Sequence, residues 1–403
     1  MNLRRAASVL LASTLTLGAT LAMGAAPAVG ASSKPRVVTI GVIAPLDAGL
    51  TSFGRGIRNS VELAVAQANA ADLVPGWTIK VRALDDSSDP LKGAKAAKKL
   101  AADPTVVAVV GPYNSGVAEQ AAPVLAKSGI ALISPSNTLT SLTQGPDPAA
   151  PKRPLATYFR MVGPDSLQAD FLAARARALG FGTAAVVSET KAVSKGLADR
   201  FAVAFSAAGG TNVVQSTVPD GATAAQFADF IASAMQAQPG VVFFGGEYEV
   251  AATLRSAATK AGLVAPMMGG DGMNDPAYIS KAGAAAAGTY ASGTGVPMDT
   301  LANGDEFLAA YNKAGYKDAP TNYGPYSYDA TNAVLNALPA ILGTAKSIPS
   351  TARAAVVAAV QATDVEGLTG RVAFDTYGDA LDPQFTLYQV SGTPAAWVAL
   401  PPA

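Results

Sequence analysis

Strand-like and helix-like segments alternate along this chain from residue 37 to residue 272. Short β-branched runs, such as 37–44 and 106–111, are each followed by a stretch with helical spacing of apolar residues, such as 56–70 and 117–128. The strand-like runs are almost wholly apolar, which is typical of parallel sheets covered by helices on both faces. The alternation therefore predicts an α/β fold built on parallel sheets.

The alternation falls into two series, which residues 159–165 separate. Because each series holds several strand–helix units, it predicts two doubly wound parallel-sheet lobes. The Gly-rich segment 288–297 has no helical periodicity, and we expect it to cross between the lobes. The patterns of the tail predict helices over 305–315, 328–341 and 351–362, and strands over 370–379 and 385–392, which could pair as a hairpin.

The composition removes the residues on which most catalytic and metal sites depend. The 403 residues include no Cys and no His. Disulfides, thiolate catalysis and Cys-bound metals are therefore excluded, and the commonest general base and metal ligand are missing. An enzyme based on carboxylates or Lys remains open, but we expect no enzymatic activity, no cofactor and no metal site.

The N-terminal segment has the pattern of a secretory signal peptide. Arg4 and Arg5 precede an apolar stretch, and small residues lead up to Ala31. We expect cleavage after Ala31, with cleavage after Ala28 or an uncleaved membrane anchor as alternatives. Removal of residues 1–31 leaves 27 basic and 29 acidic side chains. The sequence thus predicts an exported protein, and its small negative charge without a basic run argues against a nucleic-acid partner.

Small uncharged polar residues follow two neighbouring strand-like runs of the first series. Segment 113–116 comes after the run 106–111, and segment 135–138 comes after the run 130–135. At the carboxyl edge of a parallel sheet, backbone N–H groups at a helix start can hold a carboxylate. Ordinary helix capping by Ser, Thr and Asn is the alternative explanation.

Two Gly-rich segments of the second series carry acidic residues at the corresponding edge. Glu247 follows Gly245-Gly246, and Asp271 follows Gly269-Gly270. A carboxylate there could pair with an ammonium group, although a solvated turn or a helix start would also explain it. Anion-binding groups in one lobe and carboxylates in the other suit a zwitterion. No GxGxxG or GxxxxGK[ST] motif is present, which disfavours a nucleotide site.

The order and spacing of several motifs together resemble the periplasmic Leu/Ile/Val-binding family, the branched-chain amino-acid type of ABC-transporter solute-binding protein. The resemblance covers residues from about 37 to about 398. The motifs that carry it are IGVIAPLDAG…FG (40–54), DDSSDP (85–90), VVGPYNSG (109–116), ISPSNT (133–138), FRMVGPD (159–165), FFGGEYE (243–249), MGGDG (268–272) and VAFDTYGD (372–379).

The resemblance implies the periplasmic binding protein type 1 fold, in which two lobes joined by three crossings close on a ligand like a Venus flytrap. The expected N-terminal lobe comprises 36–158 and 291–363, and the expected C-terminal lobe comprises 163–288 and 366–401. The implied partners are a small-molecule ligand, expected to be an amino acid, and an ABC permease in the membrane. We expect a monomer in the periplasm or cell envelope, without a lipidated Cys. A sensory protein, or a binder of another small carboxylate or amide, is the alternative.

The resemblance also implies roles for individual residues. Asp271 would pair with the ligand's ammonium group, and Phe53 would cover the ligand. The residues implied to hold the ligand's carboxylate and amino groups are Ser115, Asn137 and Thr138, and those implied at the pocket edge are Tyr113 and Glu247. Val193 departs from the family, which commonly has a Tyr there, and this puts the ligand's identity in question. Glu247 replaces a neutral or aromatic residue, so it would favour a polar or cationic ligand side chain, or face solvent.

Overall fold

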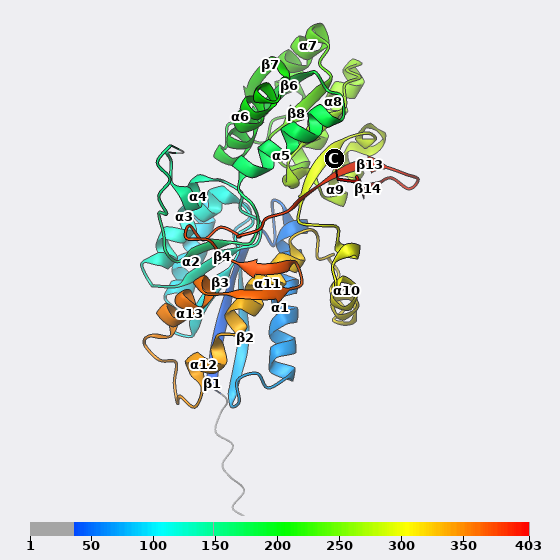
Figure 1. Ribbon diagram of the computed structural model, residues 1–403. Helices are drawn as coiled ribbons and strands as arrows, with labels where there is room; N and C mark the ends of the chain where they lie inside the picture. Colours follow the sequence, from blue (N-terminus) through cyan, green and yellow to red (C-terminus); the bar gives the residue numbers. More distant parts are fainter. Residues whose placement is uncertain (1–35, 148, 403) are drawn as a thin grey trace, which may run out of the picture. The chain divides into compact units, whose positions relative to one another are not determined.

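The computed structural model describes residues 36–147 and 149–402, so the predicted signal peptide lies outside the described residues. Within Arg36–Ala403, two sheets form two lobes, with helices on both faces of each sheet (Figure 1). The predicted α/β fold with parallel-sheet lobes is confirmed. In the described part of the chain, no helix is both long and apolar enough to span a membrane.

The first sheet consists of five parallel strands in the order β2-β1-β3-β4-β5. Its strands are β1 (Arg36–Ala44), β2 (Trp77–Asp85), β3 (Val106–Val110), β4 (Ala131–Ser134) and β5 (Tyr158–Arg160). Strands β3 and β4 are completely buried, which explains why their sequences are apolar runs without alternation.

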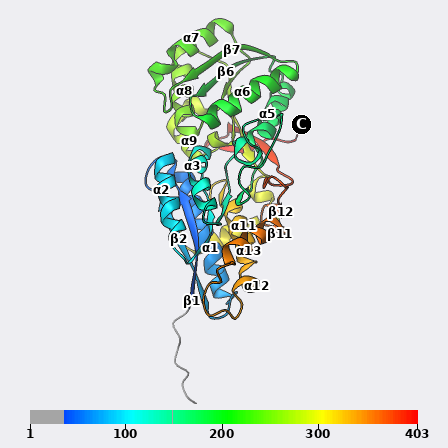
Figure 2. The same ribbon diagram turned by 90° about the vertical axis from the view of Figure 1, so that its left-hand side faces the viewer.

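The second sheet has the order β14-β13-β10-β9-β8-β6-β7. Its parallel strands are β6 (Thr183–Glu189), β7 (Thr211–Val218), β8 (Val241–Phe244), β9 (Met267–Gly269) and β10 (Tyr290–Thr294). The strands β13 (Phe385–Ser391) and β14 (Ala396–Ala399) add an antiparallel edge. Figure 2 shows α7, β7 and β6 in this lobe and α2, β2 and β1 in the other.

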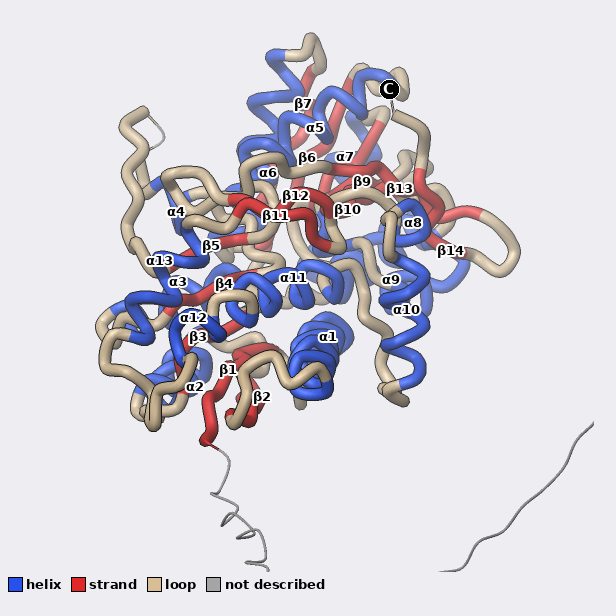
Figure 3. Tube along the Cα trace, turned by 60° about the horizontal axis from the view of Figure 1, so that its bottom comes forward, coloured by secondary structure: helices blue, strands red, loops and turns tan. Residues whose placement is uncertain are grey.

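Helices cover both faces of the two sheets because each presents one apolar stripe. In the first lobe, α1 and α11 pack together on one face, and α2 and α3 pack on the other (Figure 3). In the second lobe, α5 and α6 cover one face, and α7 and α8 cover the other. The helices are α1 (Thr51–Ala70), α2 (Pro90–Ala101), α3 (Ser115–Ala126), α4 (Ser141–Gln144), α5 (Asp165–Ala178), α6 (Ala192–Ala207), α7 (Ala228–Ala237), α8 (Tyr248–Ala261), α9 (Pro276–Ala282), α10 (Gly304–Lys313), α11 (Gly324–Leu335), α12 (Leu338–Leu342) and α13 (Ala352–Gln361).

The C-terminal part departs from the sequence prediction in its strands. The expected crossing 288–297 contains β10, which pairs with β9 and β13, so the expected boundary at 291 falls inside a strand of the second sheet. The hairpin considered for 370–379 and 385–392 does not form. Strand β12 (Gly370–Ala373) pairs instead with β11 (Asp364–Gly367).

This short β11–β12 hairpin packs on the first lobe, although residues 366–401 were expected in the second. The Asp329 carboxylate on α11 accepts hydrogen bonds from the backbone N–H groups of Leu368 and Thr369, at 2.9 and 2.7 Å. Further along, Phe374 packs edge-on against Phe159 of β5, with ring centroids 5.2 Å apart. The chain therefore returns to the second sheet only at β13.

Candidate ligand-binding site

A small cavity of about 40 Å³ lies between the two lobes, at the carboxyl ends of the parallel strands. Loops after β3 and β4 line one side, and loops after β8 and β9 line the other. The lining residues are Tyr113, Asn114, Ser115, Ser136, Thr138, Asp165, Val193, Leu197, Gly245, Gly246, Glu247, Gly270, Asp271, Gly272 and Tyr323. Three of these are carboxylates, and none of these described lining residues is a Lys or Arg.

On the first-lobe side, Ser115 and Thr138 line the cavity, as the sequence predicts. Ser115 is the first residue of α3, and its hydroxyl accepts a hydrogen bond from the Leu139 N–H at 3.3 Å. The first N–H groups of a helix have no intrahelical acceptor and carry partial positive charge. This wall of the cavity can therefore hold a carboxylate without a cationic side chain.

Asn137 does not line the cavity, contrary to the predicted ligand contact. Its amide group donates to the carbonyl oxygens of Pro112 and Tyr113, at 3.1 and 2.7 Å. Its Oδ1 accepts from the Tyr158 hydroxyl at 2.9 Å. Because its side chain is hydrogen-bonded to other protein groups, Asn137 connects the loop after β3, which carries Tyr113, to the loop after β4, which carries Thr138.

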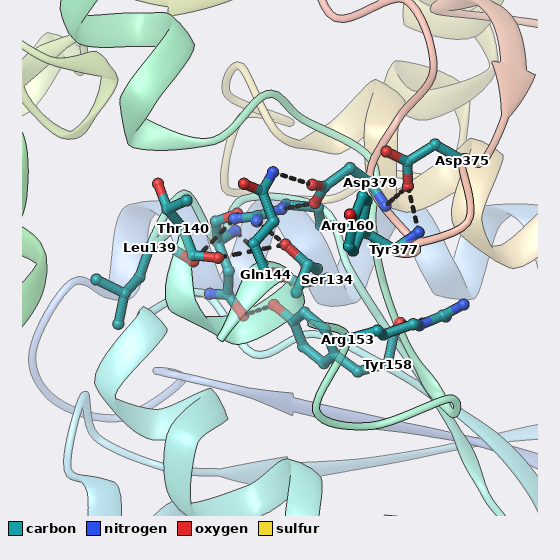
Figure 4. A network of polar contacts seen from close by, with 12 residues as sticks. Ser134, Leu139, Thr140, Gln144, Arg153, Tyr158, Arg160, Asp375, Tyr377 and Asp379 are labelled. Carbon is teal, nitrogen blue, oxygen red and sulfur yellow. Dashed lines mark hydrogen bonds and ion pairs between the residues drawn. The ribbon is translucent and has the colours of Figure 1, made fainter. Parts of the chain in front are cut away.

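A buried network on β5 holds the Thr138 loop in place (Figure 4). The Arg160 guanidinium donates to the backbone oxygens of Asn137 and Leu139, at 3.3 and 3.0 Å. It also forms an ion pair with Asp379 and bonds the Thr143 hydroxyl. The network thus ties the ligand-side loop after β4 to the segment that leads back to the second lobe.

Aromatic rings form the floor behind the cavity. Phe53 is fully buried and does not line the cavity, in contrast to its expected place over the ligand. It stacks instead on the back of Tyr113, with ring centroids 4.6 Å apart. Tyr113 lines the cavity as predicted. The Tyr323 ring packs edge-on against Tyr113 and Phe53, with centroids 5.3 and 5.1 Å away.

Asp271 lines the cavity, as predicted, but protein donors hold both of its carboxylate oxygens. Gln168 Nε2 donates to Oδ1 at 2.7 Å, and the Tyr323 hydroxyl donates to Oδ2 at 2.6 Å. Burial raises the pKa of Asp271, and the two hydrogen bonds oppose this rise. Since Tyr323 comes from the first lobe, Asp271 also joins the lobes across the cavity.

Glu247 lies at the cavity edge as predicted, but its charge is already paired. Its Oε1 accepts from Asn114 Nδ2 of the first lobe at 2.7 Å, and its Oε2 forms an ion pair with Lys191. Lys191 Nζ also lies 3.1 Å from Glu189 Oε2. Burial lowers the pKa of Lys191, but the two carboxylates outweigh burial and raise it. This pairing removes the reason to expect a cationic ligand side chain opposite Glu247.

Sequence reasoning missed three lining residues, Asp165, Leu197 and Tyr323. Asp165 is the first residue of α5 and is buried, and neither of its carboxylate oxygens has a hydrogen-bond partner among the described residues. Burial raises its pKa to about 7. In the sequence, Asp165 has the pattern of a helix-start acid, and Tyr323 stands in an irregular segment, so no local signal marked either.

Comparisons with known proteins identify the family of the chain. The family model described as periplasmic binding protein matches residues 37–394. The chain is 29% identical over 354 residues to the Leu/Ile/Val-binding protein BraC3 of Rhizobium johnstonii, covering 87% of this chain and 91% of the relative. It is 30% identical over 357 residues to Leu/Ile/Val-binding protein homolog 1 of Brucella abortus, covering 87% and 90%.

A solved structure has the same fold. The branched-chain amino acid transporter substrate-binding protein LivJ of Streptococcus pneumoniae, in complex with isoleucine, superposes with a TM-score of 0.75 at 25% identity. The superposition covers 91% of this chain and all of LivJ. From the sequence matches and the fold together, the chain belongs to the Leu/Ile/Val-binding family of periplasmic binding proteins.

Proposed function

We propose that this protein is an extracytoplasmic solute-binding protein of an ABC transporter, and that it binds an amino acid between its two lobes. One observation carries the proposal: a single cavity has a helix N-terminus with Ser115 on one wall and the carboxylates Asp165 and Asp271 on another. The first wall suits the ligand's carboxylate, and the second suits its ammonium group. The names of the relatives support the same ligand class.

Closure of the lobes around the ligand would provide the transport signal. Hydrogen bonds that cross between the lobes include Ser52 to Asp275 at 2.8 Å, Asn114 to Glu247 at 2.7 Å, and Tyr323 to Asp271 at 2.6 Å. A ligand that contacts both walls stabilises the closed arrangement, because only that arrangement offers all its contacts. The membrane permease would recognise the closed form of an exported, monomeric protein.

The small cavity favours amino acids with short or compact side chains. Val193 and Leu197 supply apolar surface, and Gly245, Gly246 and Gly270 let the ligand approach the backbone. A Cβ atom at Gly270 would lie 2.5 Å from Leu197 Cδ2 and 2.8 Å from Gln168 Oε1. These positions therefore leave little spare room around a branched or shorter aliphatic side chain.

A thermal-shift screen of residues 32–403 tests the proposal. The protein is unfolded and refolded to remove co-purified ligand, and the twenty amino acids are then compared with acids that lack an amino group. Ligand at about 100 times its dissociation constant adds about 2.7 kcal/mol to the free energy of unfolding, which raises the melting temperature. A shift only with acids that lack an amino group would refute amino-acid binding.

A further inference from the structure

A groove of about 650 Å³ on the second lobe shares no lining residue with the cavity between the lobes. Helix α5, the segment after β10, strand β13 and the C-terminal residues 399–402 form its walls, and we call it the α5 groove. The lining residues are Phe171, Ala174, Arg175, Val296, Pro297, Thr300, Phe385, Thr386, Leu387, Ala399, Leu400, Pro401 and Pro402. Its volume lies within the range of about 300–1,000 Å³ that is typical of small-molecule sites.

Apolar side chains form most of the α5 groove. The Phe171 and Phe385 rings stack with centroids 5.7 Å apart, and both residues are partly exposed. Leu400 is also partly exposed, and it packs against the core of the same lobe. Apolar surface that lines a hollow can bind an apolar group, because burial of both surfaces stabilises the complex.

Arg175 is the one charged residue among the described residues that line the α5 groove. Its exposed fraction is 9%, and its Nη2 donates to the Pro401 carbonyl oxygen at 2.8 Å. Its Nε is buried and has no acceptor among the described residues. The other polar side chains of the lining, Thr300 and Thr386, each donate to a backbone oxygen at 2.7 Å. The unused donor of the groove is therefore the Arg175 guanidinium.

No acid lines the α5 groove among the described residues, so Arg175 has no counter-charge there. The acid nearest to it in the sequence of α5 is Asp170, which pairs with Arg200 at 2.7 Å. Asp299, on the segment after β10, is exposed and is not a lining residue. A buried guanidinium without a counter-charge costs free energy, and an anion that enters the groove would supply that charge.

We propose that the α5 groove binds an amphipathic carboxylate of the medium-chain fatty-acid class. The apolar chain lies along Phe171 and Phe385, and the carboxylate binds Arg175, whose planar fork of donors matches the two oxygens. Arg175 stands ten residues after Asp165 on α5, which is about 15 Å along the helix axis. The groove is therefore a second ligand site, and its existence does not depend on the amino-acid site.

Isothermal titration calorimetry on residues 32–403 tests this inference with octanoate, decanoate, decanol and decyltrimethylammonium. The proteins are wild type, Arg175→Gln, Arg177→Gln and Ala174→Trp. Arg177 is the matched control, because it also belongs to the last turn of α5 but does not line the groove. Ala174 lines the groove and is exposed, so a Trp there fills the groove without entering the core. This variant keeps the test decisive if Arg175→Gln does not fold.

We expect wild type to bind decanoate, and to bind decanol and decyltrimethylammonium at least about tenfold more weakly. Full burial of one methylene strengthens binding about fourfold, so decanoate should bind about 4 to 15 times more tightly than octanoate. Arg175→Gln and Ala174→Trp should each weaken decanoate binding at least about tenfold. Arg177→Gln should bind decanoate as wild type does.

Several results would overturn the inference. They are an absence of saturable decanoate binding, equal affinity of wild type for decanoate and decanol, decanoate binding that survives both Arg175→Gln and Ala174→Trp, and an equal loss in Arg177→Gln. Flotation with phosphatidylglycerol vesicles distinguishes a free fatty acid from a membrane surface. Vesicle binding that Ala174→Trp abolishes, without decanoate binding, would assign the groove to a lipid surface and overturn the inference. In each case the proposed amino-acid binding, which the thermal-shift screen measures, is unaffected.

Discussion

The free energy of unfolding of the ligand-free protein should depend on pH through Asp165, and Asp165→Asn should remove that dependence. Burial raises the pKa of Asp165 from its usual 3.8 to about 7. The negative charge of the neighbouring Asp271 raises it further, and the positive charge of Arg160 lowers it. The ionised carboxylate is therefore disfavoured in the folded protein relative to the unfolded chain.

The sign and size follow from proton linkage. Between pH 3.8 and about pH 7 the folded protein holds a proton on Asp165 that the unfolded chain has released, so stability falls as pH rises. At about 1.36 kcal/mol for each pH unit, the raised pKa corresponds to about 4 kcal/mol once both states are ionised. About 3 kcal/mol of this cost develops between about pH 5 and about pH 8. Asn does not titrate, so between about pH 5 and about pH 8 the free energy of unfolding of Asp165→Asn should rise by about 3 kcal/mol relative to wild type. Any cost of burying the amide is the same at every pH and does not change this difference.

Urea unfolding followed by circular dichroism at several pH values from about 5 to about 8 measures this difference. Asp86→Asn serves as a positive control, because burial also raises the pKa of Asp86 to about 7. Both variants should show the same pH-dependent gain. A constant difference between Asp165→Asn and wild type, together with a rising difference for Asp86→Asn, would show that the Asp165 carboxyl is solvated or paired, and would refute the reasoning.

Three further changes test the cavity and its supports. Asn114→Ala removes the hydrogen bond that joins the lobes at Glu247, and we expect about tenfold weaker ligand binding by calorimetry, whereas equal affinity would exclude a role in closure. Asp379→Asn leaves Arg160 buried without its ion pair, so the free energy of unfolding measured with urea should fall by about 3–5 kcal/mol. A smaller loss would mean that a neutral amide at position 379 is enough to stabilise the buried guanidinium. Val193→Tyr fills part of a small cavity, so affinity in calorimetry should shift in favour of smaller amino acids. An unchanged order of affinities would place the Tyr ring outside the cavity.

The sequence was sufficient for the fold because apolar periodicity reports burial directly. Runs such as 106–110 are buried on both faces, and a chain can accommodate them only as central strands of a covered sheet. The C-terminal pairing was not predictable in the same way. Strand β12 pairs with β11 because Asp329, distant in sequence, binds the turn between them, and no local pattern encodes such a contact.

The candidate site was predictable only as far as chain topology determines it. Ser115, Thr138 and Asp271 follow strand ends, and strand ends of parallel sheets meet at one edge, so their convergence followed from position. Whether a polar side chain at that edge is free for a ligand depends on its hydrogen-bond partners. Asn137 and Asp165 show the difference: the Asn137 amide donates to two carbonyl oxygens, whereas no residue that the structure describes donates to either oxygen of Asp165.

That difference decides which residues can bind a ligand, and it arises from contacts between segments far apart in the chain. Asp271 is satisfied by a Gln on α5 and a Tyr on the first lobe, while Glu247 is satisfied by an Asn and a Lys from different lobes. No local sequence pattern marks any of these partners as a donor to the cavity's carboxylates. Once these partners are counted, Asp165 is the one carboxylate of the cavity lining without a hydrogen-bond donor among the described residues.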